Sequence, residues 1–284
     1  MLKIKVECFN LKYTLECGQC FRWQKIDNMT YIGVIKDRAL KVKQDNEYLY
    51  ITSNNYDNLE QVVKEYFDLN TDYKKIEEDI SKIDNNIKEA LKNTSGIRHL
   101  KQDYFETLIS YIISANNNIP RISKSINLLS EKYGKKITFE DKDYYLFPTL
   151  DSLKDVSVSD YRNLGVGFRD NYIYSTVNDL ISKNINLKSL EDLDTDSLRN
   201  VLMEFKGVGR KVADCILLFA YARKEVFPID VWVERVMSVL YFKENGGRLT
   251  KKQIQDYAKE NFGKYAGIIQ QHLFYNMRNG IIKQ

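Results

Sequence analysis

Lys211 and Asp230 are the residues whose types and surroundings point most directly to chemistry. Lys211 follows the turn Gly207-Val208-Gly209-Arg210 and begins a stripe of apolar residues at helical spacing. Burial and the positive end of a helix dipole both disfavour an ammonium group at such a position. The sequence therefore favours a neutral, nucleophilic amine at Lys211.

Asp230 follows Pro228-Ile229 and precedes an apolar run, which is the pattern of a helix N-cap. A carboxylate near Lys211 would favour the charged amine and oppose its activation. The pair makes sense chiefly if the negative charge stabilises a cation that develops on the substrate, such as a sugar oxocarbenium ion. Lys211 and Asp230 are thus the predicted catalytic residues.

The glycine-bracketed turn before Lys211 is a candidate anion site. Unpaired N–H groups at the start of the following helix attract a phosphate, and Arg210 adds positive charge. Gly207, Val208, Gly209 and Arg210 are therefore candidate contacts to a phosphate group. Many helix-turn-helix corners use glycine only to turn the chain, and this structural interpretation stays open.

Composition limits the possible classes of protein. The 284-residue chain has a formal net charge of +4, too low for a general polyanion binder, so DNA contacts would need a local cluster of Lys and Arg. The N-terminus lacks the apolar core of a signal peptide, and no apolar run reaches membrane-spanning length. We therefore expect a cytoplasmic protein with no membrane partner.

Four cysteines suit a reducing compartment. Cys17-Gly18-Gln19-Cys20 has the CxxC spacing and lies in β-like sequence, but no second Cys or His pair follows at the spacing of a zinc site. We expect no metal and no cofactor.

The apolar periodicity changes once along the chain. Residues 1 to about 55 alternate between turn signals, which predicts a small antiparallel sheet with strands at 4–9, 21–25, 31–36, 39–43 and 48–52. From Asn58 the period is helical, and almost everything after it reads as helix. The predicted fold class is α+β: a small antiparallel β-sheet N-terminal domain followed by a mostly α-helical body that contains a helix-hairpin-helix motif.

The expected domains are an N-terminal sheet domain with connecting helices (1–93), a helical domain (94–194), and a catalytic region with C-terminal helices (195–284). In the last region one helix ends near Phe205, a second runs from Lys211 to about 221, and a third begins at Asp230.

Two loops carry further candidate residues. Three asparagines at 116–118 end an apolar helix and favour a turn, with Arg121 exposed in the next helix; they could cap the helix or face DNA. A second glycine turn at 164–169 carries Phe168 and Arg169. Phe168 either returns to the core or fills the gap left by an extruded nucleotide, in which case Arg169 would reach the unpaired base.

Residues 206–215 and 228–231 together resemble the signature of the helix-hairpin-helix DNA glycosylases, and among them 8-oxoguanine DNA glycosylase/lyase. Segments 18–23, 116–121 and 266–274 resemble the same family, as does the turn at 164–169. The iron–sulfur branch of the superfamily carries a four-cysteine C-terminal loop, which this chain cannot build because no cysteine follows Cys215.

The resemblance implies a base pocket. By analogy, the carbonyl of Gly18 accepts a hydrogen bond from N7–H of the lesion, Gln270 contacts its Watson–Crick edge, and Cys215 and Phe274 stack on its faces. Without the family, Gly18 could equally form a bulge in a strand, and the other three could be helix packing residues.

The resemblance also implies how the DNA is held. Asn116, Arg121 and Arg169 would contact the opposite cytosine, with Phe168 nearby. The implied protein is a monomer that acts on double-stranded DNA containing oxidised guanine, expels the base with Lys211 and cleaves the strand by β-elimination.

The sequence departs from the family at one position, and two alternative functions stay open. Trp232 stands where relatives commonly carry histidine, and His272 is expected at the surface. A glycosylase/lyase for another damaged base would share Lys211 and Asp230. A non-catalytic protein that binds DNA structure would have no need of this pair.

Overall fold

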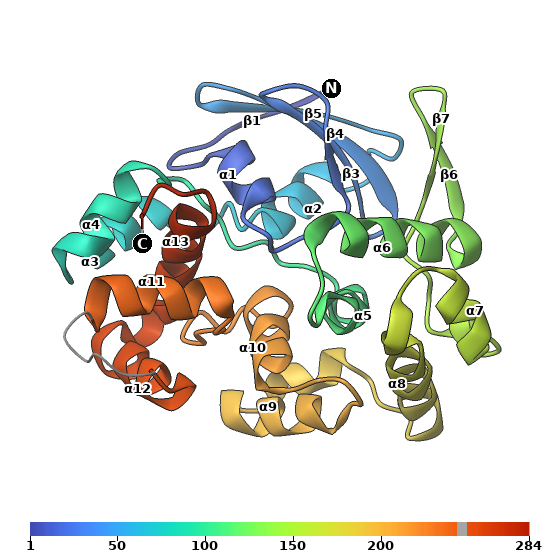
Figure 1. Ribbon diagram of the computed structural model, residues 1–284. Helices are drawn as coiled ribbons and strands as arrows, with labels where there is room; N and C mark the ends of the chain where they lie inside the picture. The colour runs from blue at the N-terminus through green and yellow to red at the C-terminus, as the bar shows by residue number, and fades with distance from the viewer. Residues whose placement is uncertain (243–248, 284) are drawn as a thin grey trace.

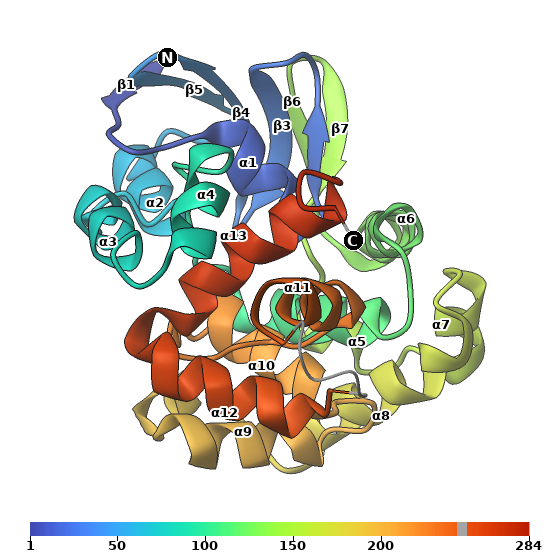
Figure 2. The same ribbon diagram turned by 60° about the vertical axis from the view of Figure 1, so that its left-hand side comes forward.

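The computed structural model describes residues 1–242 and 249–283. An antiparallel sheet forms one end of the molecule, and a helical body lies against it (Figure 1, Figure 2). This arrangement confirms the predicted α+β class. Across the described ranges, no helix is both long and apolar enough to cross a membrane.

The N-terminal sheet has five antiparallel strands in the order β1-β5-β4-β3-β2. Its strands are β1 (Leu2–Lys5), β2 (Trp23–Lys25), β3 (Thr30–Ile35), β4 (Arg38–Asp45) and β5 (Tyr48–Ser53). Along β5 every second residue is buried, because one face packs on a hydrophobic core while the other is partly solvated. All five predicted strands exist, with boundaries that differ by a few residues.

A short helix, α1 (Leu11–Glu16), interrupts the expected run of strands. Asn10 caps it by accepting a hydrogen bond from the backbone N–H of Tyr13. Gly18 follows with φ of +81°, in the left-handed region that favours glycine. The prediction that the CxxC segment lies in β-like sequence, with Gly18 as a possible strand bulge, is therefore wrong; Gly18 turns the chain after a helix.

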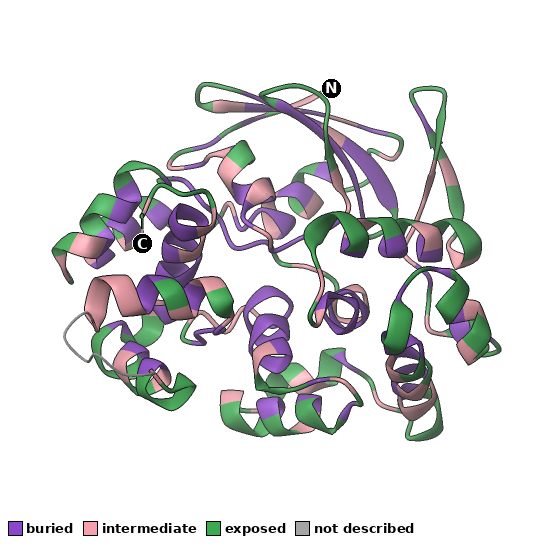
Figure 3. Cartoon of the chain, viewed as in Figure 1, coloured by how far each residue is buried: buried purple, intermediate pink, exposed green. Residues whose placement is uncertain are grey.

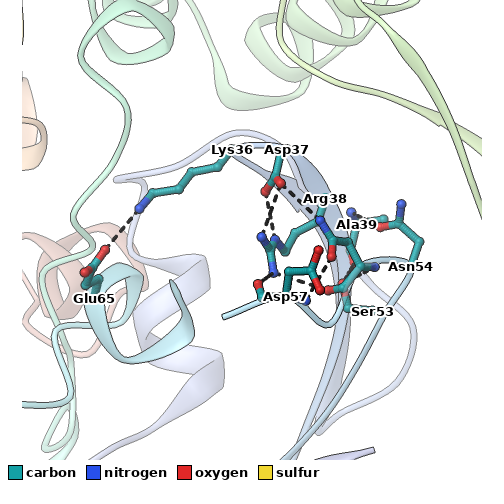
Figure 4. A network of polar contacts seen from close by, with 9 residues as sticks. Lys36, Asp37, Arg38, Ala39, Ser53, Asn54, Asp57 and Glu65 are labelled. Carbon is teal, nitrogen blue, oxygen red and sulfur yellow. Dashed lines mark hydrogen bonds and ion pairs between the residues drawn. The ribbon is translucent and has the colours of Figure 1, made fainter. Parts of the chain in front are cut away.

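Buried Arg38 holds the loop that joins the sheet to the first helix of the body, α2 (Leu59–Tyr66) (Figure 4). Its Nη1 donates to the carbonyls of Asn55 at 3.2 Å and Asp57 at 2.7 Å. Lys36 forms an ion pair of 3.1 Å with Glu65 of α2. The two Arg38 hydrogen bonds fix the loop between β5 and α2, because they replace hydrogen bonds that the loop backbone would otherwise make with water.

Twelve described α-helices follow α1. They are α2 (Leu59–Tyr66), α3 (Tyr73–Ile80), α4 (Asn85–Lys92), α5 (Tyr104–Ser114), α6 (Ile119–Tyr133), α7 (Val158–Asn163), α8 (Asp170–Ser182), α9 (Thr195–Glu204), α10 (Arg210–Phe219), α11 (Val231–Tyr241), α12 (Lys251–Asn261) and α13 (Ala266–Arg278). Most of α5 and α10 is buried, and both lie near the centre of the body (Figure 3). The helix α10, which carries Lys211 and Cys215, is therefore enclosed by other elements.

The body also contains an unpredicted hairpin, formed by β6 (Lys136–Phe139) and β7 (Lys142–Tyr145). Glu140 and Asp141 connect the strands with φ of 48° and 57°, the left-handed pair of a tight two-residue turn. Phe139 packs with a small cluster on the N-terminal sheet. Almost everything after residue 58 was expected to be helix, and this segment is the exception.

Three large hydrophobic clusters divide the chain differently from the expected boundaries at 93 and 194. The first lies under the N-terminal sheet and includes α2, and the second joins α5–α10. The third combines α3 and α4 with α11–α13, so chain segments far apart in sequence share one core (Figure 2). Helices near residues 73–92 therefore pack with the C-terminal helices and not with the sheet that precedes them.

His272 lies within α13 and is fully buried, so its predicted place at the surface is wrong. Its Nδ1 lies 2.8 Å from the Thr94 hydroxyl. Burial lowers the pKa of His272 from 6.5 to about 4, which keeps the ring neutral at pH 7. His99 is also buried, and burial lowers its pKa to about 3.

These pKa shifts predict how stability depends on pH. Between pH 6.5 and about 4 the unfolded chain binds protons that the folded chain does not, so the free energy of unfolding falls as the pH is lowered. For His272 the full effect is roughly 3 kcal/mol. His272→Gln should therefore reduce the loss of stability between pH 7 and 4.5, as measured by urea denaturation at both pH values. An identical loss in both proteins would contradict this assignment.

Candidate active site

The turn between α9 and α10 depends on Gly207 for a steric reason. Gly207 has φ of +87°, and a methyl group added to it would lie 2.4 Å from the Tyr172 ring of α8. Val208 is buried and belongs to the core, and its backbone N–H already donates to the carbonyl of Phe205 at 3.0 Å. Gly209 is the N-cap of α10 and has no side chain to cover the N–H groups of the first turn. These groups are therefore open to an anion.

A buried ion pair holds α9 against α10. Arg199 donates through Nε to Asp214 at 2.6 Å, and both side chains are less than one-tenth exposed. Arg210 lies 3.8 Å from the same carboxylate, but its side chain is 58% exposed. Asp214 thus fixes the hairpin from behind, while Arg210 keeps its guanidinium at the surface.

Lys211 lies in the first turn of α10 and is half-buried. Its Nζ lies 5.6 Å from the centroid of the Tyr111 ring. Cys215 is one turn further along and fully buried; burial raises the pKa of its thiol to about 11, although the nearby Lys211 amine acts in the opposite direction. The amine is therefore held against the sulfur and an aromatic ring and does not extend into bulk solvent.

Asp230 is the N-cap of α11, as predicted. Its Oδ1 accepts hydrogen bonds from the backbone N–H groups of Trp232 at 3.0 Å and Val233 at 2.9 Å. Among the described residues, Oδ2 has no hydrogen bond. The carboxylate is half-buried and close enough to Cys215 to contribute to its raised pKa. One oxygen is thus used for capping and the other is available to a ligand.

Lys211 and Asp230 line one cavity of about 390 Å³. The four residues predicted to bind the base line the same cavity: Gly18, Cys215, Gln270 and Phe274. The volume lies within the range of small-molecule pockets and suits one extruded nucleotide. The structure thus brings together residues from the N-terminal turn, α10, the start of α11, and α13.

The Gly18 turn is anchored by Gln19, a residue that was not singled out from the sequence. Gln19 is fully buried, and its Nε2 donates to the carbonyls of Thr14 at 2.9 Å and Arg98 at 2.7 Å. Its Oε1 accepts from the backbone N–H of Leu100 at 2.9 Å. The CxxC spacing drew attention to the flanking cysteines, whereas the glutamine between them holds the turn in place.

Gln270 and Phe274 lie one turn apart on α13, so both project from the same side of this helix. Gln270 is buried, and its Oε1 accepts a hydrogen bond from Gln271 at 2.9 Å. Phe274 is half-buried and carries the Arg278 guanidinium over its ring at 5.2 Å from the centroid. Arg278 also lines the cavity and was not predicted.

The asparagine-rich turn lies at the rim of the cavity. Asn116 is exposed and left-handed with φ of 50°, and Arg121 is exposed in the first turn of α6. Asn118 caps α6 by accepting from the backbone N–H of Arg121 at 3.1 Å. Asn117 and Asn118 line the cavity and Asn116 does not. The asparagine-rich turn therefore both caps α6 and presents exposed polar side chains at the rim of the cavity.

Phe168 and Arg169 differ from each other in exposure. Phe168 is 56% exposed, as an inserting side chain would need to be. Arg169 is only 6% exposed; its Nε donates to the Ala115 carbonyl at 2.8 Å and its Nη2 to that of Asn116 at 2.9 Å. The guanidinium of Arg169 faces inward and supports the Asn116 turn, and its expected contact with DNA stays a prediction.

The described residues contain no cluster of three or more His, Cys, Asp or Glu side chains suited to a metal ion. The four cysteines are all unpaired thiols.

Comparison with known proteins identifies the family. A sequence profile described as the N-terminal domain of 8-oxoguanine DNA glycosylase matches residues 1–108, and a profile described as the HhH-GPD superfamily base excision DNA repair protein matches residues 109–264. N-glycosylase/DNA lyase OGG1 of Arabidopsis thaliana is 30% identical, over 96% of this chain and 78% of its own length. The N-glycosylase/DNA lyase of Saccharomyces cerevisiae is 31% identical, over 93% of this chain and 82% of its own length.

Solved structures agree with the sequence matches. The structure of Clostridium acetobutylicum 8-oxoguanine glycosylase/lyase, in complex with double-stranded DNA containing cytosine opposite to 8-oxoG, is 38% identical and has a TM-score of 0.92. The similarity covers 99% of this chain and 99% of that chain. Profiles, relatives and fold thus lead to one conclusion: the chain belongs to the 8-oxoguanine DNA glycosylase family of the helix-hairpin-helix superfamily of base excision repair proteins.

Proposed function

We propose that this protein removes 8-oxoguanine from double-stranded DNA and then cleaves the strand at the abasic site. The observation that carries the proposal is that Lys211 and Asp230 line one cavity together with the four expected base-binding residues. The Clostridium relative has been solved with a duplex that contains 8-oxoG, which supports the same substrate.

The proposed chemistry starts at the deoxyribose. The amine nitrogen of Lys211 attacks C1′, the bond from C1′ to N9 breaks, and the purine leaves with the bonding electrons. The Asp230 carboxylate stabilises positive charge that develops on C1′ and O4′. After ring opening, Lys211 holds C1′ as a Schiff base; loss of a proton from C2′ then expels the 3′ phosphate by β-elimination. Hydrolysis of the Schiff base releases the enzyme.

Base selection is assigned to the Gly18 carbonyl. Guanine has a lone pair at N7, whereas 8-oxoguanine carries a hydrogen there. A fixed carbonyl therefore gains a hydrogen bond from the lesion but meets a second acceptor when guanine enters, a difference of about 1–3 kcal/mol. Cys215 and Phe274 would stack on the faces of the base, and Gln270 would contact its Watson–Crick edge.

The DNA is proposed to be held at the rim of the cavity. Phe168 would fill the gap left by the extruded nucleotide, and Asn116 and Arg121 would contact the opposite base. Arg169 could reach that base only after releasing its carbonyl partners, so in this state it supports the turn. Gly207 and Gly209 would bind a phosphate through backbone N–H groups, with Val208 holding the turn between them and the exposed Arg210 beside them.

We propose that the protein acts as a monomer, since one copy supplies every residue of the cavity. A cytoplasmic location is proposed because four unpaired thiols suit a reducing compartment.

Assays on defined duplexes test the proposed function. The protein should release the base and nick the strand on duplexes with 8-oxoguanine opposite cytosine, and faster than on duplexes with thymine glycol or 3-methyladenine. Placing 8-oxoguanine opposite each of the four bases would measure opposite-base preference. Preferential release of another lesion would favour a glycosylase/lyase for that base. Failure to incise any lesion-bearing duplex, with binding retained, would favour a non-catalytic DNA-structure binder.

A further inference from the structure

Arg278, in the last turn of α13, contacts both parts of the wall expected to recognise the base. Its Nη2 donates to the carbonyl of Glu16, the last residue of α1, two residues before Gly18. The guanidinium also lies over the Phe274 ring at 5.2 Å. One side chain therefore connects the N-terminal turn to the C-terminal helix, 262 residues apart in the sequence.

The contact with Gly18 is close. A methyl group added to Gly18 would lie 3.0 Å from Nη1 of Arg278 and 3.4 Å from Cε1 of Phe274. Two constraints therefore favour glycine at position 18: the backbone has a positive φ, and Arg278 and Phe274 occupy the space that a side chain would need. The three residues pack as one unit along the cavity, which all three line.

The guanidinium of Arg278 leaves one of its hydrogen-bond donors unused. Within the described residues, its Nη1 is buried and has no hydrogen-bond partner. A buried donor without a partner costs free energy, and an uncharged side chain could fill the space without that cost. The arrangement is therefore better explained by a role in shaping the pocket than by a role in packing alone.

We propose that Arg278 is a positioning residue of the base pocket, which holds the Gly18 carbonyl and the Phe274 ring in the arrangement that recognises an oxidised purine. This inference rests on the proposed function. Without Arg278, the peptide after Gly18 and the Phe274 ring would each gain freedom, and the hydrogen bond to N7–H and the stacking contact would no longer be pre-organised.

Two reactions of the same protein separate this role from a structural one. Excision of 8-oxoguanine needs the base pocket, whereas cleavage of a duplex that already contains an abasic site needs only Lys211 and the sugar site. In Arg278→Ala, single-turnover excision should fall by about 10- to 100-fold, which is the effect of a misplaced recognition group. Cleavage at the preformed abasic site should stay within about twofold of wild type, as for a substitution away from the reacting atoms.

Variants make the test specific. Arg278→Lys should lose nearly as much excision, because a single ammonium group cannot both donate to the Glu16 carbonyl and cover the Phe274 ring. Asn279→Ala is the matched control for the end of α13, since within the described part of the chain its side chain bonds only the Tyr275 carbonyl of its own helix at 2.8 Å. It should leave both reactions unchanged.

A double-mutant cycle with Gly18→Ala tests the coupling. If Arg278 acts through Gly18, the loss of excision caused by Gly18→Ala should be smaller in the Arg278→Ala background than in wild type. Equal excision by wild type and Arg278→Ala, or a parallel fall in both reactions, would overturn the inference. Absence of 8-oxoguanine release by the wild-type protein would overturn the proposed function and this inference with it.

Discussion

Lys211→Gln should bind lesion-containing DNA but lose both base excision and strand cleavage. Glutamine is close to lysine in length and keeps the contact surface with Tyr111 and Cys215, but its amide nitrogen is not a nucleophile. Removal of a nucleophile costs at least about a thousandfold in rate. The measurements are single-turnover excision, nicking of an abasic duplex, and covalent trapping of the Schiff base with borohydride.

The trapping result is decisive, because only an amine that has attacked C1′ can be reduced onto DNA. Wild type should form the covalent complex and Lys211→Gln should form none. Lys259→Gln is a suitable control, since this exposed lysine lies in the last turn of α12 and does not line the cavity. Trapping of the Lys211→Gln protein at the wild-type level would assign the nucleophile to another amine.

Short-range features of the fold were predictable from the sequence. The helix-hairpin-helix around Gly207 and Gly209 was found because glycine turns and the 3.6-residue period act over a few residues. The α1 helix was missed because six residues give too little periodicity, and Asn10 is its one local signal. The hairpin at 136–145 was missed because its left-handed turn uses Glu140 and Asp141 and contains no glycine.

The arrangement of the candidate site could not be predicted from local sequence patterns alone. Periodicity places Lys211 on a helix and Asp230 at a cap, but it does not bring Gly18 and Phe274 into one cavity, because these contacts bridge most of the chain. The resemblance to a family supplied that convergence. The exposure of individual polar side chains was also not predictable from the sequence. Arg169 and His272 are polar residues in loop or helical sequence, and only tertiary packing determines that both are buried.

Asp230→Asn should fold normally but lose most of its excision activity. Asparagine caps helices about as well as aspartate, so Oδ1 can still accept from the N–H groups of Trp232 and Val233. The negative charge near C1′ is lost, and removal of one electrostatic group of this kind costs about 100- to 1,000-fold in rate. Single-turnover excision and thermal denaturation of the same protein measure the two effects.

Asp230→Ala is the matched variant, because it removes the charge and the cap together. It should show the same loss of excision as Asp230→Asn and, in addition, a loss of stability of about 1 kcal/mol from the uncapped α11. If Asp230→Asn excises 8-oxoguanine as fast as wild type while Asp230→Ala does not, capping alone explains the residue. The charge would then have no part in catalysis, and the oxygen left open toward the cavity would need another role.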